Sequence, residues 1–234
     1  MVFSNKIFTF LIGTTLASGH PEIVSGDCIV MANVFEATRR RKLRQRRRRL
    51  VGRAYDMALE VARVVPREAR VLDVGCGNGF IAHHLTAILG VKVLGIDVMT
   101  AADAPIEFLS YDGRHFPVSD KSFDAVLLCY VLHHAQDFRV VLGEVRRVLR
   151  DGGLVVVYED IPRLWWDRFI CWTHDLQWRR RTGHCVFRRG PEWCRLFRSL
   201  GFDIVLDRPL SRWRNLAHPV SRWFYVLSIS QPRP

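Results

Sequence analysis

Features that define several other protein classes are missing from this sequence of 234 residues. It has no run of 18 uncharged apolar residues, so it predicts no membrane-spanning helix. Its six cysteines lack the spacing of a small disulfide scaffold, which indicates free thiols and a reducing compartment. It has no internal repeat, and its length suits one full hydrophobic core better than two thin ones. These absences leave an ordinary globular domain with flanking segments.

Metal-ligand spacing is also missing. Cys171-x-x-His174, His184-Cys185 and Cys194 match no standard pair of zinc ligands. The sequence therefore predicts no metal site, and the cysteines are expected to be small buried hydrophobes.

The N-terminus permits three interpretations. Lys6 and the apolar stretch that follows it to Ala17 imitate a short secretory signal. A flexible tail is one alternative. A translation start placed too far upstream, with Met31 as the functional beginning, is the other.

Positive charge is abundant, with a formal net charge of +12, and it is concentrated at both flanks. Residues 39–49 contain nine cations and no anion, residues 50–160 are slightly acidic, and the remainder is basic again. Such a run can bind anionic lipid, bind the phosphates of nucleic acid, or be a solvated face without a partner. It contains no aromatic platform for single-stranded nucleic acid, which favours the membrane surface over nucleic acid. We expect residues 1–49 to form a flexible or helical tail with a basic arm, and residues 50–234 to form the domain.

An α/β fold is predicted by the order of the elements after the arm. Apolar positions recur at helical spacing from Leu50 to Val65. The expected strands are 70–74, 91–97, 106–110, 123–129, 154–158, 204–206 and 224–229, and the further helices are 80–89, 138–150 and 191–200. Apolar strands that alternate with helices indicate a parallel sheet covered on both faces. We therefore predict a seven-stranded, mostly parallel sheet with helices on both faces, and a helical insert at about 161–190 after the fifth strand.

A glycine-rich turn follows the first expected strand. Gly75-x-Gly77-x-Gly79 lets a ligand approach the backbone, and glycine permits the positive φ of a tight turn. Asp73 precedes this turn, where it would repel a pyrophosphate but suits a ligand that carries an ammonium group. Asp97 ends the second strand, where a carboxylate can accept ribose hydroxyls. The combination is much more specific than the glycines alone.

This region resembles the first motif of class I S-adenosylmethionine-dependent methyltransferases, which spans residues 71–79 here. Later segments resemble the same family in order and spacing, and they are 112–117, 122–126, 131–134 and 147–153. Residues 131–134 resemble its small-molecule and quinone-type branch, whereas Asp151 replaces a usual proline. The resemblance covers about residues 50–160 and, more faintly, 191–202, but neither the basic arm nor the insert.

The resemblance implies a Rossmann-like fold, methyl transfer, and S-adenosylmethionine as the cofactor. The implied contacts are Asp73, Gly75 and Gly77 for the methionine part, Asp97 for the ribose, Asp112 for the adenine amino group, Gly113 and Phe116 for the adenine pocket, and Cys129 and Tyr130 beneath the sulfonium. Alternative roles stay open for three of them: a helix cap for Asp97, a turn aspartate for Asp112, and a core residue for Cys129.

Methyl transfer needs a general base only if the acceptor atom starts protonated. His133, His134 and Glu159, with Asp160 beside it, are expected at the carboxyl edge of the sheet and are the candidates for catalysis. Packing or a helix start is the alternative role of the histidines, and simple solvation is the alternative for the carboxylates.

The acceptor is expected at the insert, where this fold usually places its acceptor-covering segment. Trp165, Trp166 and Trp172 would cover an aromatic or lipid-like body, and Arg180 would meet an anionic head. The alternative is an ordinary helical lid whose aromatic side chains pack inward.

We therefore predict methyl transfer to a small or lipid-like acceptor with an anionic or aromatic group. A nucleic-acid methyltransferase is an alternative, although residues 129–132 lack the Asn/Asp-Pro-Pro-aromatic motif of amino-directed enzymes. A catalytically silent binding module is another, although it would not need all the cofactor motifs. A cytosolic cofactor argues for a cytoplasmic protein, with peripheral membrane contact as an option.

Overall fold

The computed structural model describes residues 38, 39, 41, 44, 51–211 and 219–230. The chain divides into two compact units, Met1–Arg47 and Arg48–Pro234. The described residues of the first unit are Thr38, Arg39, Arg41 and Arg44, which are helical and exposed. The expected signal-like stretch, Met31 and most of the basic arm lie outside the described residues.

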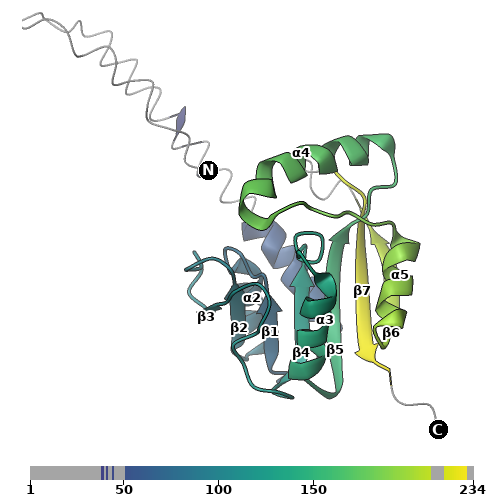
Figure 1. Cartoon of the computed structure of the whole chain (residues 1–234). Coiled ribbons are helices and arrows are strands. Elements are labelled where there is room, and N and C mark those ends of the chain that lie inside the picture. The colour runs from purple at the N-terminus through teal and green to yellow at the C-terminus, as the bar shows by residue number, and fades with distance from the viewer. Residues whose placement is uncertain (1–37, 40, 42–43, 45–50, 212–218, 231–234) are drawn as a thin grey trace, which may run out of the picture. The chain divides into compact units, whose positions relative to one another are not determined.

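A single seven-stranded sheet forms the centre of the second unit, in the order β3-β2-β1-β4-β5-β7-β6. The strands are β1 Val71–Val74, β2 Val93–Asp97, β3 Glu107–Ser110, β4 Phe123–Cys129, β5 Leu149–Asp160, β6 Phe202–Leu210 and β7 Arg222–Ile229. β1 to β5 pair in parallel, and β7 pairs antiparallel with both β5 and β6. The predicted fold is therefore confirmed (Figure 1).

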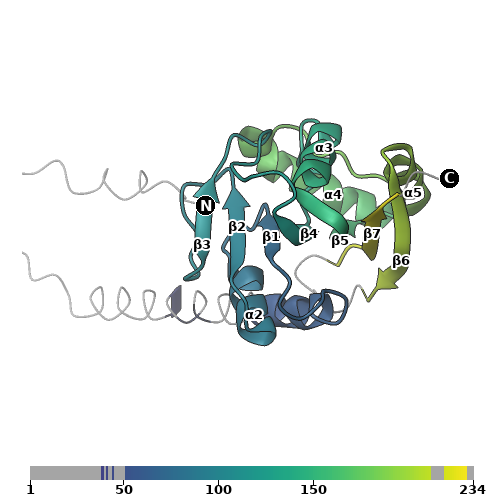
Figure 2. The ribbon, with the colours of Figure 1, turned by 90° about the horizontal axis from the view of Figure 1, so that it is seen from below.

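Helices cover both faces of the sheet, and one further helix covers the carboxyl ends of its strands (Figure 1). They comprise the helical residues 51–61 and α2 Phe80–Leu89, α3 Phe138–Val148, α4 Trp165–Thr182 and α5 Gly190–Ser199. The helix at 51–61 and α2 pack on one face, whereas α3 and α5 pack on the other, as Figure 2 shows. α4 lies across the carboxyl ends of the central strands (Figure 1). Ligands of such sheets bind at that edge.

Three strands are longer than the apolar pattern predicted, β7 by two residues and β5 and β6 by more. β5 begins at Leu149 rather than 154, and its pairing with β4 contains an irregularity between Phe123 and Ala125. β6 extends to Leu210, and after Phe202 its side chains alternate between exposed and half-buried positions, as on a strand with one solvated face. A search for continuous apolar runs detects only the middle of such a strand.

The N-terminus of α4 is fixed by a buried carboxylate. Oδ2 of Asp167 accepts the N–H groups of Arg163 (2.9 Å) and Leu164 (3.1 Å). The Ser221 hydroxyl donates to the same oxygen at 2.9 Å, which links the helix to the segment before β7. The carboxylate of Asp167 thus satisfies backbone N–H groups at the start of the helix, and its bond to Ser221 anchors the insert to the sheet.

The two phenylalanines Phe197 and Phe169 provide a matched test of this packing. Phe197 on α5 is fully buried between Trp193 and Tyr225, whereas Phe169 on α4 is 54% exposed. We expect Phe197→Ala to lower the free energy of unfolding by about 3–5 kcal/mol, the usual cost of such a core cavity. Phe169→Ala should change it by no more than about 0.5 kcal/mol. Urea denaturation measures both, and equal effects would show that the core is wrongly assigned.

Candidate functional site

The turn after β1 has the conformation that its glycines predict. Gly75, Gly77 and Gly79 all have positive φ, at 67°, 53° and 76°. A Cβ on Gly75 would lie 2.5 Å from a methyl group of Val131, so the loop after β4 packs directly on this turn. Apart from its chain neighbours, no atom of the described residues lies within 4 Å of a Cβ built on Gly77. The turn is therefore closed on one side and open to a ligand at Gly77.

Asp97 links this turn to the end of β2. Its Oδ2 accepts the N–H of Gly77 at 2.7 Å, and its Oδ1 accepts the N–H of Met99 at 3.0 Å. The carboxylate is buried, at the end of the strand where the sequence predicted it. Each carboxylate oxygen has a second lone pair, so the group can still accept from a ligand.

Asp73 is a buried carboxylate whose charge is not balanced by hydrogen-bond donors. Both its oxygens lack a hydrogen-bond partner among the described residues. Burial, and then the charge of Asp97, raise the pKa of Asp73 to about 7. A buried carboxylate is costly unless it meets a cation or hydrogen-bond donors. This position beside the open turn therefore suits a positively charged ligand.

The turn after β3 supports the alternative role of Asp112. Its Oδ1 accepts the N–H groups of Arg114 and His115, both at 2.7 Å, and its Oδ2 lies 3.0 Å from Nδ1 of His115. Those hydrogen bonds hold the pKa of this exposed carboxyl well below its usual range. Gly113 follows with a φ of 81°. Asp112 thus has the geometry of a turn aspartate, and its contact with adenine stays a prediction.

Phe116 is buried against Tyr111, with the ring centroids 5.6 Å apart. Arg147 donates to the carbonyl of Phe116 at 3.0 Å, and the carboxylate of Glu144 accepts its N–H at 2.7 Å. The segment is therefore held firmly against α3, which positions the predicted wall of the adenine pocket.

Cys129 ends β4, and Tyr130 follows with a φ of 62°. This left-handed conformation is uncommon for a bulky residue and marks a constrained position. The guanidinium groups of Arg53 and Arg222 lie 5.0 and 5.7 Å from the Tyr130 ring centroid. Cys129, beside it, is half-buried. Both residues therefore lie at the carboxyl end of β4, where the sequence placed them. Their position beneath the sulfonium stays a prediction.

Tyr130 also lines a small pocket of about 40 Å³ that opens to solvent. The other lining residues come from the helix at 51–61, β5 and the β6–β7 end: Arg53, Asp56, Met57, Glu60, Tyr158, Leu210, Ser211 and Arg222. No sequence motif pointed to this pocket, because its residues are separated along the chain.

Glu159 and His133 form a buried pair at the same edge. Oε1 of Glu159 accepts the N–H of Leu132 at 2.8 Å, and its other oxygen lies 2.6 Å from Nδ1 of His133. Burial alone would lower the pKa of His133, but the carboxylates of Glu159 and Asp160 outweigh it and raise that pKa. Nε2 of His133 has no hydrogen-bond partner within the described chain. Glu159 thus fixes the ring with its second nitrogen available.

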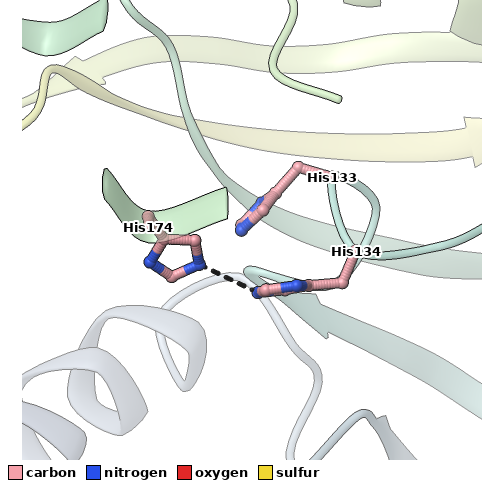
Figure 3. A group of neighbouring side chains, drawn as sticks. All are labelled: His133, His134 and His174. Atoms are coloured by element: carbon pink, nitrogen blue, oxygen red, sulfur yellow. Dashed lines mark hydrogen bonds between the residues drawn. The ribbon is translucent and has the colours of Figure 1, made fainter. Parts of the chain in front are cut away.

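His134 and His174 lie beside that ring (Figure 3). Their Nε2 atoms are 3.1 Å apart, and Nδ1 of His134 lies 3.1 Å from Oγ1 of Thr182 and 3.2 Å from Sγ of Cys185. Burial, and then the neighbouring histidines, lower the pKa of His134 to about 3. His174 comes from α4 and was missed as a partner of His133 and His134, because 40 residues separate it from His134.

α4 turns most of its other aromatic residues away from this group. Large exposed apolar side chains form a stripe along its outer face, and we call them the outer stripe: Trp165, Trp166, Phe169, Trp172 and Leu176. The alternative in which the tryptophans pack inward is wrong for Trp165, Trp166 and Trp172, the most exposed being Trp165 at 67%. Trp178, which was not singled out, packs 5.4 Å from His134 instead. Arg180 is exposed.

Two further expectations concern the whole domain. The free thiols are confirmed for the cysteines that the structure describes, which are Cys76, Cys129, Cys171, Cys185 and Cys194. Among the described helices, none combines the length and the apolar character needed to cross a bilayer.

A family model for a methyltransferase domain matches residues 27–206. The chain is 27% identical to a sterol 24-C-methyltransferase of Schizosaccharomyces pombe, over 68% of this chain and 46% of that protein. It is 35% identical to a demethylmenaquinone methyltransferase of Thermus thermophilus, over 47% of this chain and 53% of the relative. The chain thus spans about half the length of these curated relatives.

Solved structures share the fold. A SAM-dependent methyltransferase from Methanosarcina mazei superposes with a TM-score of 0.57 at 20% identity, covering 73% of this chain and 97% of that one. At this identity the likeness concerns the fold.

The raised pKa of Asp73 predicts a pH-dependent cost of folding. Between about pH 4 and pH 7 the folded protein keeps a proton that the unfolded chain has lost, so this group lowers stability as the pH rises through that window. Asp73→Asn should remove this decline, and its stability relative to the wild type should rise toward pH 7 by up to about 3–4 kcal/mol. Denaturant unfolding from pH 4 to 8 measures the difference. Asp203→Asn, at an exposed position of β6, is the control and should retain the wild-type slope, whereas a pH-independent difference for Asp73→Asn would contradict the assignment.

Proposed function

The chain belongs to the methyltransferase-domain family, and we propose that it transfers a methyl group from S-adenosylmethionine to a lipid-like acceptor with an anionic or aromatic group. The single observation that carries the proposal is the uncompensated, buried carboxylate of Asp73 beside a glycine turn that is open at Gly77. The family supports the reaction, and the outer stripe supports the acceptor class.

The residues present fit the cofactor. S-adenosylmethionine carries an ammonium group and supplies a methyl group already activated by positive sulfur. Asp73 would accept the ammonium, Gly75 and Gly77 would admit the methionine part, and Asp97 would accept the ribose hydroxyls through its remaining lone pairs. The proposed adenine pocket consists of Asp112, Gly113 and Phe116, and Cys129 and Tyr130 would lie beneath the sulfur.

The chain's own contribution to the reaction is alignment and the exclusion of water. Val131 packs against Gly75, which holds the loop after β4 against the cofactor turn. His133 and His134 would meet the acceptor atom, with Nε2 of His133 as the group that accepts a proton. Glu159 is fully buried and engaged with Leu132 and His133. We therefore propose it as a positioning residue that orients the imidazole.

A lipid-like acceptor is supported by α4. Exposed tryptophan and phenylalanine side chains on one helix are typical of contact with a membrane interface. Arg168, Arg179 and Arg180 are exposed on the same helix, while its anions Asp167 and Asp175 are buried. An aromatic stripe with exposed cations suits an anionic bilayer. We propose that the outer stripe rests on the membrane that contains the acceptor, with the basic arm as a second contact.

A nucleic-acid acceptor is the second candidate, because the run of cations at 39–49 could bind phosphates. Exposed aromatic rings beside cations would also stack on single-stranded bases, so what speaks against this candidate is the sequence of residues 129–132, which lacks the Asn/Asp-Pro-Pro-aromatic motif of amino-directed enzymes.

Calorimetry tests the cofactor. We expect S-adenosylmethionine to bind and NAD not to bind. Asp97→Ala should weaken the binding by about 1.5–3 kcal/mol, the scale of a lost hydrogen bond to a charged group. Asp203→Ala, at an exposed position, is the control and should leave it unchanged. Binding of NAD alone would overturn the proposal, and an unchanged affinity in Asp97→Ala would show that the ribose is wrongly placed.

Transfer of labelled methyl groups tests the acceptor. After incubation with cell extract, we expect label in the lipid fraction; label only in RNA or protein would contradict the proposal.

Trp165→Ala combined with Trp172→Ala should reduce sedimentation with anionic vesicles and label transfer, while cofactor affinity stays within about 0.5 kcal/mol of wild type. Val205→Ala removes an apolar side chain that is 61% exposed on β6 and should change neither. Loss of cofactor affinity in the tryptophan variant would instead make α4 part of the cofactor pocket.

A further inference from the structure

Three imidazoles converge at the carboxyl edge of the sheet. His133 and His134 come from the loop after β4, and His174 comes from α4 (Figure 3). One nitrogen from each ring can be chosen so that all three lie within 4.8 Å of one another. His133 is buried and the other two are half-buried, so the group is enclosed without being sealed. From this geometry we propose that His133, His134 and His174 form a binding site for a divalent transition-metal ion, Zn²⁺ in particular.

The distances suit a small ion. Zinc–nitrogen bonds of about 2.0–2.1 Å in a tetrahedral site place the ligating nitrogens about 3.4 Å apart. The Nε2 atoms of His134 and His174 are already 3.1 Å apart. The ligand atoms lie within 4.8 Å of one another, and the half-buried rings of His134 and His174 would close the remaining separation by moving toward His133, whose own ring Glu159 fixes.

Hydrogen bonds at the opposite ring nitrogens favour the tautomer that binds metal. A metal-ligating histidine almost always donates its other N–H to a carboxylate or another oxygen. Nδ1 of His133 has Glu159 at 2.6 Å, and Nδ1 of His134 has the Thr182 hydroxyl at 3.1 Å. That hydroxyl donates to the carbonyl of Trp178 at 3.4 Å, so its oxygen is free to accept from His134. Two of the three rings are therefore arranged to direct Nε2 into the space between them.

The surroundings fix the ring of His133 and place an aromatic wall beside the other two. Phe187 stacks on His133 with the ring centroids 4.6 Å apart, and Trp178 lies 5.4 Å from His134 and 6.0 Å from His174. The N–H of Val186 donates to the carbonyl of His133 at 2.8 Å. A carboxylate behind a ligating imidazole and a hydrophobic shell around it are common features of zinc sites in proteins.

Two consequences follow from a bound ion. Because His174 belongs to α4 and the other ligands to the loop after β4, the ion would clamp the insert to the sheet. An acceptor oxygen could bind at the open position, where the ion would lower the pKa of its hydroxyl. The ion would then replace Nε2 of His133 as the group that promotes loss of the acceptor's proton. This second consequence rests on the proposed function, whereas the binding itself does not.

Cobalt serves as the spectroscopic probe for the test. The full chain, free of any affinity tag and dialysed against a chelator, is titrated with Co²⁺, and Zn²⁺ is then added as competitor. We expect about one Co²⁺ per chain, visible absorption typical of tetrahedral cobalt, displacement by Zn²⁺, and a higher melting temperature with metal. His174→Ala should weaken binding at least tenfold, and Thr182→Val, which leaves all three ligands in place, should weaken it about tenfold.

His83→Ala is the matched control, since it removes a histidine from α2 outside the group and should bind as the wild type does. A wild-type chain without a saturable cobalt site would overturn the proposal. Equal affinity in His174→Ala and His83→Ala would overturn it too. If His174→Ala does not fold, an unchanged affinity in Thr182→Val would overturn it instead. Calorimetry with S-adenosylmethionine on the same samples keeps the two proposals apart: intact cofactor binding without metal refutes the metal site alone, and metal binding without cofactor refutes the proposed function alone.

Discussion

The carboxyl edge of the sheet depends on one buried carboxylate, that of Glu159 at the end of β5. Its two oxygens hold the backbone of Leu132 and the ring of His133, so the loop after β4 is fixed to the neighbouring strand. The next residue, Asp160, pairs with Arg222 at 3.1 Å and extends the link to β7. Burying these charges is costly, and the cost is offset only because each meets a donor of suitable geometry. What results is a rigid edge on which a histidine presents one available nitrogen.

Asp73 forms the contrast to Glu159. Both carboxylates are buried, but the described residues provide donors for Glu159 and none for Asp73. The fold therefore carries an electrostatic cost beside the glycine turn, and a cationic ligand would relieve it. Such a cost is expected at a functional site rather than in a structural core. At this edge the protein itself provides the hydrogen-bond donors for Glu159. For Asp73, a bound cationic ligand would have to provide them.

α4 has one face packed against this edge and one face exposed to the outside of the protein. Its inner face contributes Asp167, His174 and Trp178 to buried hydrogen bonds and ring contacts. Its outer face exposes the outer stripe. A helix that is apolar on the side away from the core does not gain stability from that side. One face of α4 is therefore tied to the carboxyl edge of the sheet, and the other exposes apolar side chains to the outside.

The sequence by itself determined the sheet, the glycine turn and the positions of Asp73 and Asp97, because these features depend on contiguous residues: apolar strands, glycines that need positive φ, and acidic groups at strand ends. It also predicted the insert, but not the direction of its side chains. Trp165 and Trp178 have the same chemistry and lie on the same helix, and only packing against the sheet decides that the first is exposed and the second contacts His134. The tertiary structure likewise decided that His174 joins His133 and His134, since spacing along the chain carries no information on contacts between an insert and a distant loop.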